Sequence, residues 1–199
     1  MDAKPSRYGL NISAIESKWD CIYGQADSSV PIEVLLNNTF LLPAEGVALD
    51  LACGLGANAL LLAEHGLDTH AWDVSSVALA KLTQNAQNKS LKLTIKQLFI
   101  EADKLPKNSF DVIVLGHFLD RSLCDAIMDS LKPDGLLFYQ TYVREKVGSK
   151  GPNNPVFLLA RNELLELFSP LKVLVYRENS RVGNLACGER NEALFIGQK

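Results

Sequence analysis

Short apolar runs and segments with helical spacing alternate along most of the chain. Apolar runs that end at glycines or polar residues predict strands, and apolar residues three or four apart predict helices. The predicted strands are 47–51, 69–74, 93–101, 110–116, 136–142, 171–177 and 192–197. The predicted helices between them are 57–65, 75–88, 120–131 and 162–168, with Ser75 as the N-cap of the second. This alternation predicts right-handed crossovers and a mostly parallel sheet of the α/β class.

The two ends of the chain depart from this alternation. No helix separates the last two predicted strands, so we expect them to pair antiparallel at one edge of the sheet. Residues 1–46 hold one predicted helix, 32–42, and an N-terminal segment expected to lie across the mouth of a site. Without repeats or low-complexity tracts, the chain predicts a single domain over 1–199, with 1–46 as a helical cap segment and 47–199 as the sheet and its helices.

Composition narrows the choice of partners. The 20 Lys and Arg against 23 Asp and Glu give a formal net charge of −3, which argues against a nucleic acid or membrane held chiefly by a positive field. No apolar run is long enough to span a bilayer and the first five residues are too polar for a signal peptide, so we expect a cytoplasmic protein. The four scattered cysteines predict neither a metal site nor a disulfide framework, but buried or half-buried thiols. Nothing predicts the oligomeric state.

A Gly-x-Gly turn joins the first predicted strand to the first helix. Asp50 lies four residues before Gly54, and Gly56 directly precedes the helix. Glycines let the backbone approach a ligand, and free amides at a helix start offer donors to a polar or anionic group. Asp73 ends the second strand, at a spacing from which an acid accepts both hydroxyls of a ribose. A tight turn or an acid at a helix start needs no ligand, but the combination favours a bound nucleoside.

The order of the motifs resembles the class I S-adenosylmethionine-dependent methyltransferases over roughly residues 45–199. The pieces that carry the resemblance are DLACGLG at 50–56, WDVS at 72–75, LP at 105–106, SFD at 109–111, LKPDG at 131–135 and YQTY at 139–142. The first two are similar to the small tellurite-resistance-type branch. The resemblance implies a doubly wound, Rossmann-like sheet of seven strands, mostly parallel with an antiparallel C-terminal strand. It also implies S-adenosyl-L-methionine as the cofactor and methyl transfer by in-line displacement.

The resemblance further implies which residues hold the cofactor. The glycines would pack against its methionine part, with Asp50 holding their loop and the cofactor's amino group, and Asp73 would bind the ribose. Glu101 falls where the family places the acid that meets the adenine amino group, and Asp103 competes with it if the loop is shifted by two residues. The expected cofactor-binding residues are Asp50, Gly54, Gly56, Asp73, Val74, Glu101, Ala102, Leu115 and Gly116.

The acceptor site is less defined by the sequence. A thiolate or oxyanion is already nucleophilic, so side chains that position it would suffice without a dedicated base. The candidate residues are His117, Tyr142, Arg144, Arg177 and Arg181. Each arginine is equally open to a solvated role, and His117 to a structural one. Trp19 and Tyr23 either cap the cofactor, as the resemblance implies, or form one face of a helix on the core.

We therefore expect an enzyme that methylates a small acceptor, such as a chalcogen oxyanion, a thiol or a similar metabolite. The predicted strands and helices use nearly all 199 residues, so no large insert is expected that would recognise a protein or nucleic acid. One alternative is an NAD(P)-dependent oxidoreductase, since GLGANA at 54–59 also fits a dinucleotide fingerprint. The other is a sensor or partner protein that binds the cofactor without catalysis. Ala57 in place of a common Arg, and Ala186 and Cys187 in place of a common His-Arg pair, keep that alternative open.

Overall fold

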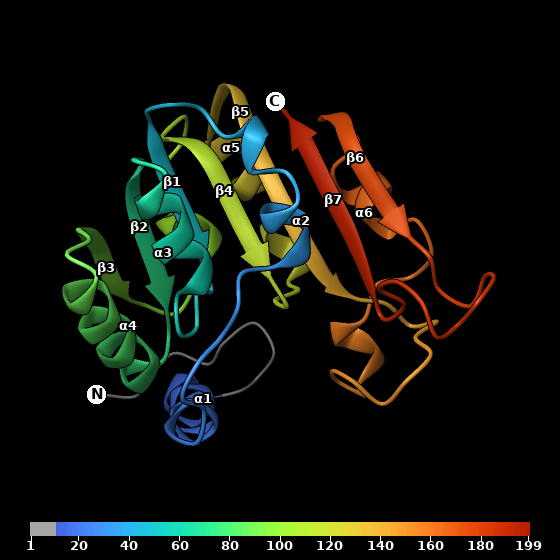
Figure 1. Ribbon diagram of the computed structural model, residues 1–199, viewed down its shortest axis with the longest axis horizontal. Helices are drawn as coiled ribbons and strands as arrows, with labels where there is room; N and C mark the ends of the chain where they lie inside the picture. Colours follow the sequence, from blue (N-terminus) through green and yellow to red (C-terminus); the bar gives the residue numbers. More distant parts are fainter. Residues whose placement is uncertain (1–10) are drawn as a thin grey trace.

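Residues 11–199, which the computed structural model of the protein describes, form one seven-stranded sheet in the order β3-β2-β1-β4-β5-β7-β6 (Figure 1). The strands are β1 (Val47–Leu51), β2 (Asp68–Asp73), β3 (Leu93–Gln97), β4 (Phe110–Gly116), β5 (Leu131–Tyr142), β6 (Lys172–Glu178) and β7 (Glu192–Gln198). The helices are α1 (Ile12–Gly24), α2 (Glu33–Leu36), α3 (Ala57–Glu64), α4 (Ser76–Asn88), α5 (Cys124–Ser130) and α6 (Glu163–Leu167). β1 to β5 pair parallel, and β7 pairs antiparallel with both β5 and β6. The predicted α/β sheet with an antiparallel C-terminal strand is confirmed.

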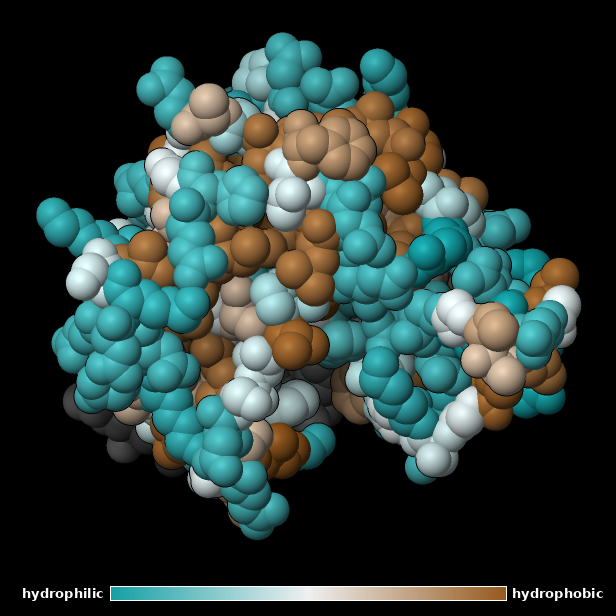
Figure 2. All heavy atoms as spheres, in the orientation of Figure 1, coloured by the Kyte–Doolittle hydropathy of each residue, from teal (hydrophilic) through white to brown (hydrophobic). Residues whose placement is uncertain are grey.

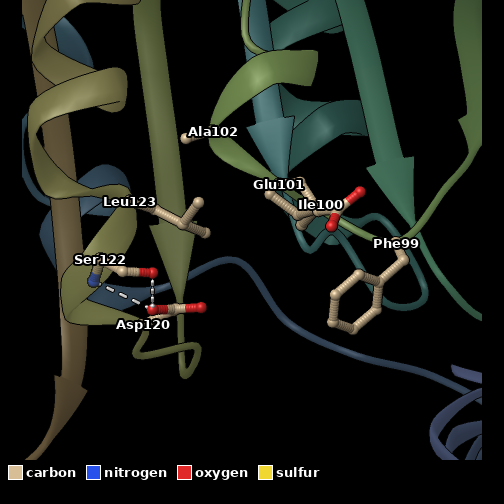
Figure 3. A pocket seen from close by; sticks show the side chains of 7 residues that line it. All are labelled: Phe99, Ile100, Glu101, Ala102, Asp120, Ser122 and Leu123. Carbon is tan, nitrogen blue, oxygen red and sulfur yellow. Dashed lines mark hydrogen bonds between the residues drawn. The ribbon is translucent and has the colours of Figure 1, made fainter. Parts of the chain in front are cut away.

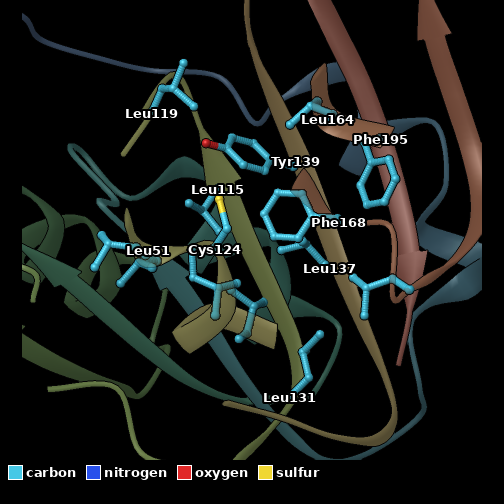
Figure 4. Packing of buried hydrophobic residues seen from close by; sticks show 14 of the residues in the cluster. Leu51, Leu115, Leu119, Cys124, Leu131, Leu137, Tyr139, Leu164, Phe168 and Phe195 are labelled. Atoms are coloured by element: carbon cyan, nitrogen blue, oxygen red, sulfur yellow. The ribbon is translucent and has the colours of Figure 1, made fainter. Parts of the chain in front are cut away.

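Helices cover both faces of the sheet because its central strands are apolar on both sides. In β4, Ile113 and Leu115 pack in a cluster that includes residues of α5 and α6. Val112 and Val114 point to the other face and pack in a cluster with residues of α2 and α3. Figure 4 shows the first cluster, where the ring of Phe168 lies 5.6 Å from that of Tyr139 and 5.8 Å from that of Phe195. With both faces covered, the carboxyl ends of the parallel strands remain the edge at which a ligand can bind.

Two helices differ from the prediction. The predicted helix 32–42 is wrong as one element, because it divides into α2 and a 3-10 turn, Thr39–Leu41. The side chain of Asn38 donates to the carbonyl of Val34 (2.8 Å), an alternative to the helical backbone bond. The predicted helix 120–131 instead begins with a 3-10 turn, Arg121–Leu123, in which the carboxylate of Asp120 caps the amide of Ser122.

Two strand boundaries also differ. The predicted strand 93–101 ends at Gln97, and a loop leads from there to the 3-10 turn Ala102–Lys104. β5 begins at Leu131 rather than at 136, so it includes the Lys-Pro-Asp-Gly segment. The register between β4 and β5 shifts at this segment. Asp134 has a φ of 64° there, and its amide donates to the carbonyl of Lys199, so the end of the chain secures the irregular turn.

α1 is not among the helices predicted from apolar spacing, and none of its residues is buried. It is held instead by polar contacts with α4. Asp20 accepts the hydroxyl of Ser75 (2.6 Å) and the amide of Val77 (3.2 Å), while Lys81 donates to the carbonyl of Tyr23 (2.8 Å). α1 therefore lies against the start of α4, below the carboxyl ends of β1 and β2 in Figure 1.

The remaining expectations from composition have mixed outcomes. All four cysteines are unpaired, but only Cys53 and Cys124 are buried; the expected burial is wrong for Cys21 and Cys187, which are exposed. Within residues 11–199, no helix is long and apolar enough to cross a membrane. The same residues contain no group of His, Cys, Asp and Glu side chains arranged to hold a metal ion.

Candidate active site

The glycine loop between β1 and α3 is held from below by Asp50. This buried carboxylate accepts the backbone amide of Ala59 (3.0 Å) and the side-chain amide of Asn58 (3.3 Å). Burial raises the pKa of Asp50 to about 7, because the two donors only partly offset the lost hydration. Asp50 thus fixes the start of α3, whereas its contact with a cofactor amino group stays a prediction.

Asp73 holds the other side of the same loop. Its two carboxylate oxygens accept the amides of Gly54 and Ser75, each at 2.8 Å. Burial raises the pKa of Asp73 against the opposing effect of these two amides. A carboxylate offers about four acceptor positions, so two remain for donors of a ligand. This is the chemistry that the two hydroxyls of a ribose require.

The two glycines of the loop are required for different reasons. Both have the left-handed φ that favours glycine, 52° at Gly54 and 76° at Gly56. A Cβ on Gly56 would lie 2.3 Å from Cδ1 of Leu82, so this glycine allows α3 to pack against α4. A Cβ on Gly54 would lie 2.6 Å from the hydroxyl of Tyr23 in α1. Gly54 therefore lies against α1, whereas Gly56 lies against α4.

Tyr23 brings α1 over the loop. Its ring stacks on Trp19 at 5.6 Å, so both aromatics share one face of a helix, but the expected packing of that face on the core is wrong because no residue of α1 is buried. Burial, together with the negative charges of Asp73 and Asp50, raises the pKa of Tyr23, so its hydroxyl stays protonated at neutral pH. Tyr23 can therefore donate a hydrogen bond to a ligand that lies between α1 and the loop.

A small pocket lies beside the 3-10 turn after β3 (Figure 3). Its lining residues are Phe99, Ile100, Glu101, Ala102, Asp120, Ser122 and Leu123. In Figure 3, Ile100 and Glu101 lie opposite Leu123 and Asp120. Apolar walls with a carboxylate between them suit a purine ring that carries an amino group. Asp103 is not among the lining residues; its side chain is 74% exposed and pairs with Lys104.

The remaining residues expected to bind the cofactor lie at the same edge of the sheet. The carbonyl of Val74 accepts the side-chain amide of Gln97 (3.2 Å), between Asp73 and the start of α4. Leu115 is buried at the end of β4, and a Cβ on Gly116 would lie 3.5 Å from the amide nitrogen of Asn58. The end of β4 thus lies against the residue that Asp50 holds.

A buried carboxylate that the sequence analysis missed, Glu192, organises the ends of β4 and β5. It accepts His117 Nε2 at 2.9 Å, Gln140 Nε2 at 2.6 Å and Lys150 Nζ at 2.8 Å. Burial alone would raise its pKa, but these donors, His117 first, hold the pKa of Glu192 at about 2. Glu192 is therefore ionised at neutral pH. In the sequence, the one indication of this role is that Glu192 begins a strand expected to pair antiparallel. That pairing places Glu192 opposite Tyr142.

Two of the five predicted acceptor-site residues come together in this group. The His117 ring stacks on Tyr142 with 4.9 Å between centroids and 27° between planes. The three arginines each have other partners. Arg177 pairs with Glu33 of α2, Arg181 donates to the carbonyl of Lys146 (3.2 Å), and Arg144 adds to the effect of Arg121 in lowering the pKa of Glu163. Among the described residues, no hydrogen bond or ion pair joins these arginines to His117, Tyr142 or Glu192.

Comparison with known proteins agrees with this geometry. The methyltransferase domain family matches residues 48–135, which include the glycine loop, Asp73 and the pocket beside Glu101. Over these residues the chain is similar to that family, and the order of the strands agrees with the α/β sheet that the resemblance implies. The acceptor positions left on Asp73 and the carboxylate of Glu101 beside an apolar gap suit S-adenosyl-L-methionine, but they do not identify a methyl acceptor.

Two comparisons connect the chain with TehB by similarity. A protein of Haemophilus influenzae strain Rd named "Probable S-adenosyl-L-methionine-dependent methyltransferase TehB" is 28% identical over 137 residues, which are 66% of this chain and 48% of that protein. The chain thus spans about half the length of this curated relative. The crystal structure of TehB from Haemophilus influenzae has a TM-score of 0.69 at 20% identity, covering 92% of this chain and 67% of that one.

A second solved structure shows the same fold with similar coverage of both chains. It belongs to work on the conversion of a disulfide bond into a thioacetal group during echinomycin biosynthesis. Its TM-score is 0.69 at 17% identity, with 93% of this chain and 92% of that chain covered. At this identity the likeness shows the fold alone.

Proposed function

We propose that the protein transfers the methyl group of S-adenosyl-L-methionine to a small-molecule acceptor. The observation that carries this proposal is Asp73, which accepts the amide of Gly54 in the glycine loop and the amide of Ser75 before α4, and keeps acceptor positions for a ribose. When bound, the cofactor supplies a methyl group made electrophilic by the sulfonium. The protein then has to hold the acceptor in line with that methyl group and exclude water.

The proposed binding roles follow the edge of the sheet. Asp73 holds the ribose, Glu101 accepts from the adenine amino group, and the backbone of Ala102 donates to the ring. At the other end, the glycine loop, the hydroxyl of Tyr23 and the backbone of Leu115 and Gly116 surround the methionine part, with Val74 beside the ribose. Asp50 acts through the loop that it holds.

Glu101 and Asp103 are separated by a matched pair of variants. Glu101→Gln is expected to weaken the binding of S-adenosylhomocysteine about 5- to 20-fold, because a buried amino group loses a charged acceptor worth roughly 1 to 2 kcal/mol. Asp103→Asn is expected to leave the affinity within twofold, since that side chain does not line the pocket and pairs with Lys104. Titration calorimetry of both variants measures this. The reverse order of effects would assign the adenine to Asp103.

The acceptor is proposed to be a chalcogen oxyanion, a thiol or a similar small metabolite. Within residues 47–199 the longest connections are 143–162 and 179–191, and no separate unit for recognising a macromolecule stands apart from the sheet and its helices. The formal charge of −3 also disfavours nucleic acid as the partner.

The test is a screen for release of S-adenosylhomocysteine from S-adenosyl-L-methionine. The acceptor panel contains selenite, tellurite, 2-mercaptoethanol, 4-nitrothiophenol and a primary amine. We expect release above the acceptor-free rate with an oxyanion or a thiol. Tight cofactor binding without release across a widened panel would instead support the alternative of a non-catalytic sensor or partner protein.

A further inference from the structure

We propose that His117, oriented by Glu192, takes the proton from a thiol acceptor that enters the site uncharged. This rests on the proposed methyl transfer and deepens it, because it names both the acceptor class and the residue that prepares it. An already ionised acceptor would need no such base. The structure favours this role over a purely structural one through the geometry, exposure and charge of the group around His117.

The hydrogen bond to Glu192 determines which nitrogen of His117 carries the proton. Glu192 is fully buried and can only accept, so the proton of a neutral imidazole lies on Nε2, 2.9 Å from the carboxylate. The lone pair is then on Nδ1, and no hydrogen bond among the described residues involves that atom. The His117 side chain is 40% exposed, whereas Glu192 is covered. A buried carboxylate thus orients a partly open imidazole.

The imidazole is also held at the carboxyl end of β4, the edge of the sheet at which the cofactor is expected. His117 has a φ of 57°, an uncommon conformation for a residue with a side chain, and its amide donates to the carbonyl of Gln140 (2.8 Å). Gln140 donates from its side chain to Glu192 and accepts the amide of Val34 (2.9 Å). His117 directly follows Gly116, which lies near the side chain of Asn58 in the first turn of α3. His117 is therefore the residue next to Gly116, whose backbone is expected to contact the methionine part of the cofactor.

The charges around His117 favour a neutral acceptor. Glu192 of β7 faces the ring, Tyr142 of β5 stacks on it, and Lys150 lies 2.8 Å from Glu192 and 3.8 Å from Glu189. Burial raises the pKa of Tyr142, so that hydroxyl is uncharged at neutral pH. Glu192 and Glu189 carry two negative charges and Lys150 carries one positive charge, so this group has a net negative charge. An oxyanion is repelled there, whereas a protonated thiol is not.

The proposed step balances as a proton transfer coupled to methyl transfer. Nδ1 of His117 accepts the thiol proton while the acceptor sulfur forms its bond to the methyl carbon. The electron pair of the broken carbon–sulfonium bond stays on the cofactor sulfur. The products are a methyl thioether, S-adenosylhomocysteine and an imidazolium, whose charge Glu192 stabilises until the exposed ring loses its proton to solvent.

Two thiols distinguish a role of His117 as a base from a purely structural role. 2-Mercaptoethanol is protonated at neutral pH, whereas 4-nitrothiophenol is already ionised. His117→Asn, chosen because Asn tolerates a left-handed φ, is expected to lower kcat for 2-mercaptoethanol about 100-fold and for 4-nitrothiophenol less than threefold. His65→Gln changes an exposed histidine and is the control. Equal losses with both thiols, or no loss with either, would overturn the proposal.

A readout without turnover accompanies the kinetics. Long-range nitrogen–proton NMR spectra of the wild-type protein should show His117 as the Nε2–H tautomer, and Glu192→Gln should change that signal and no other histidine's. An Nδ1–H tautomer would overturn the proposal. Release of S-adenosylhomocysteine with oxyanions but not with 2-mercaptoethanol would overturn it while leaving the proposed function intact. Failure to bind S-adenosylhomocysteine would overturn both.

Discussion

Replacing Asp73 by alanine is expected to weaken the binding of S-adenosylhomocysteine at least 100-fold. The buried carboxylate keeps two acceptor positions beyond those used by Gly54 and Ser75. Hydrogen bonds to a charged group contribute roughly 1.5 to 3 kcal/mol each, so losing two of them costs at least about 3 kcal/mol, which is more than a factor of 100. Titration calorimetry at one pH and salt concentration measures the change.

The control for this variant is Asp68→Ala. Asp68 lies on the same strand but is exposed at its opposite end, so its removal should leave the affinity within twofold. Because Asp73 also holds the glycine loop, the thermal midpoint of each variant is measured alongside. A folded Asp73→Ala protein with less than threefold weaker binding would show that Asp73 does not contact the cofactor.

The second large effect is on stability. Gly56→Ala is expected to reduce the free energy of unfolding by about 2 to 4 kcal/mol, because it adds both backbone strain and overpacking. The φ of 76° disfavours a side chain, and the new Cβ would meet Leu82 in the packed contact between α3 and α4. A protein of this length should lose roughly 6 to 12 °C in Tm, measured by differential scanning calorimetry.

Two other glycines make this result specific. Gly24→Ala should change stability by less than about 0.5 kcal/mol, since a Cβ there meets nothing within 4 Å. Gly54→Ala should be milder for stability than Gly56→Ala, because its Cβ meets the end of the Tyr23 side chain rather than a packed helix. Equal Tm values for Gly24→Ala and Gly56→Ala would contradict the packing role of Gly56.

Local patterns in the sequence predict most of the sheet and the cofactor side of the site. β1 and β4 match the predicted strands residue for residue, because continuous apolar runs bounded by glycines or polar residues mark strands covered on both faces. The glycine loop and Asp73 are predictable because their spacing lies within one strand-turn-helix unit. The pocket beside Glu101 agrees with one of the two acids that the resemblance left open.

Features that depend on distant contacts are not predictable in this way. α1 has no buried stripe to reveal it, because Asp20 and Lys81 attach it to α4 through polar contacts more than 50 residues away in the chain. Glu192 becomes part of the site only when β7 pairs antiparallel with β5. Likewise, the sequence alone does not show whether an arginine is free to contact an acceptor. In the fold, Arg177 forms an ion pair with Glu33.

Binding of the cofactor by the wild-type protein is the most direct test of the central claim. Isothermal titration calorimetry with S-adenosyl-L-methionine, S-adenosylhomocysteine and NADH compares the methyltransferase with the oxidoreductase alternative in one set of conditions. We expect micromolar binding of the first two ligands and no binding of NADH. Binding of NADH, with neither of the other ligands bound, would contradict the assignment of this site to methyl transfer.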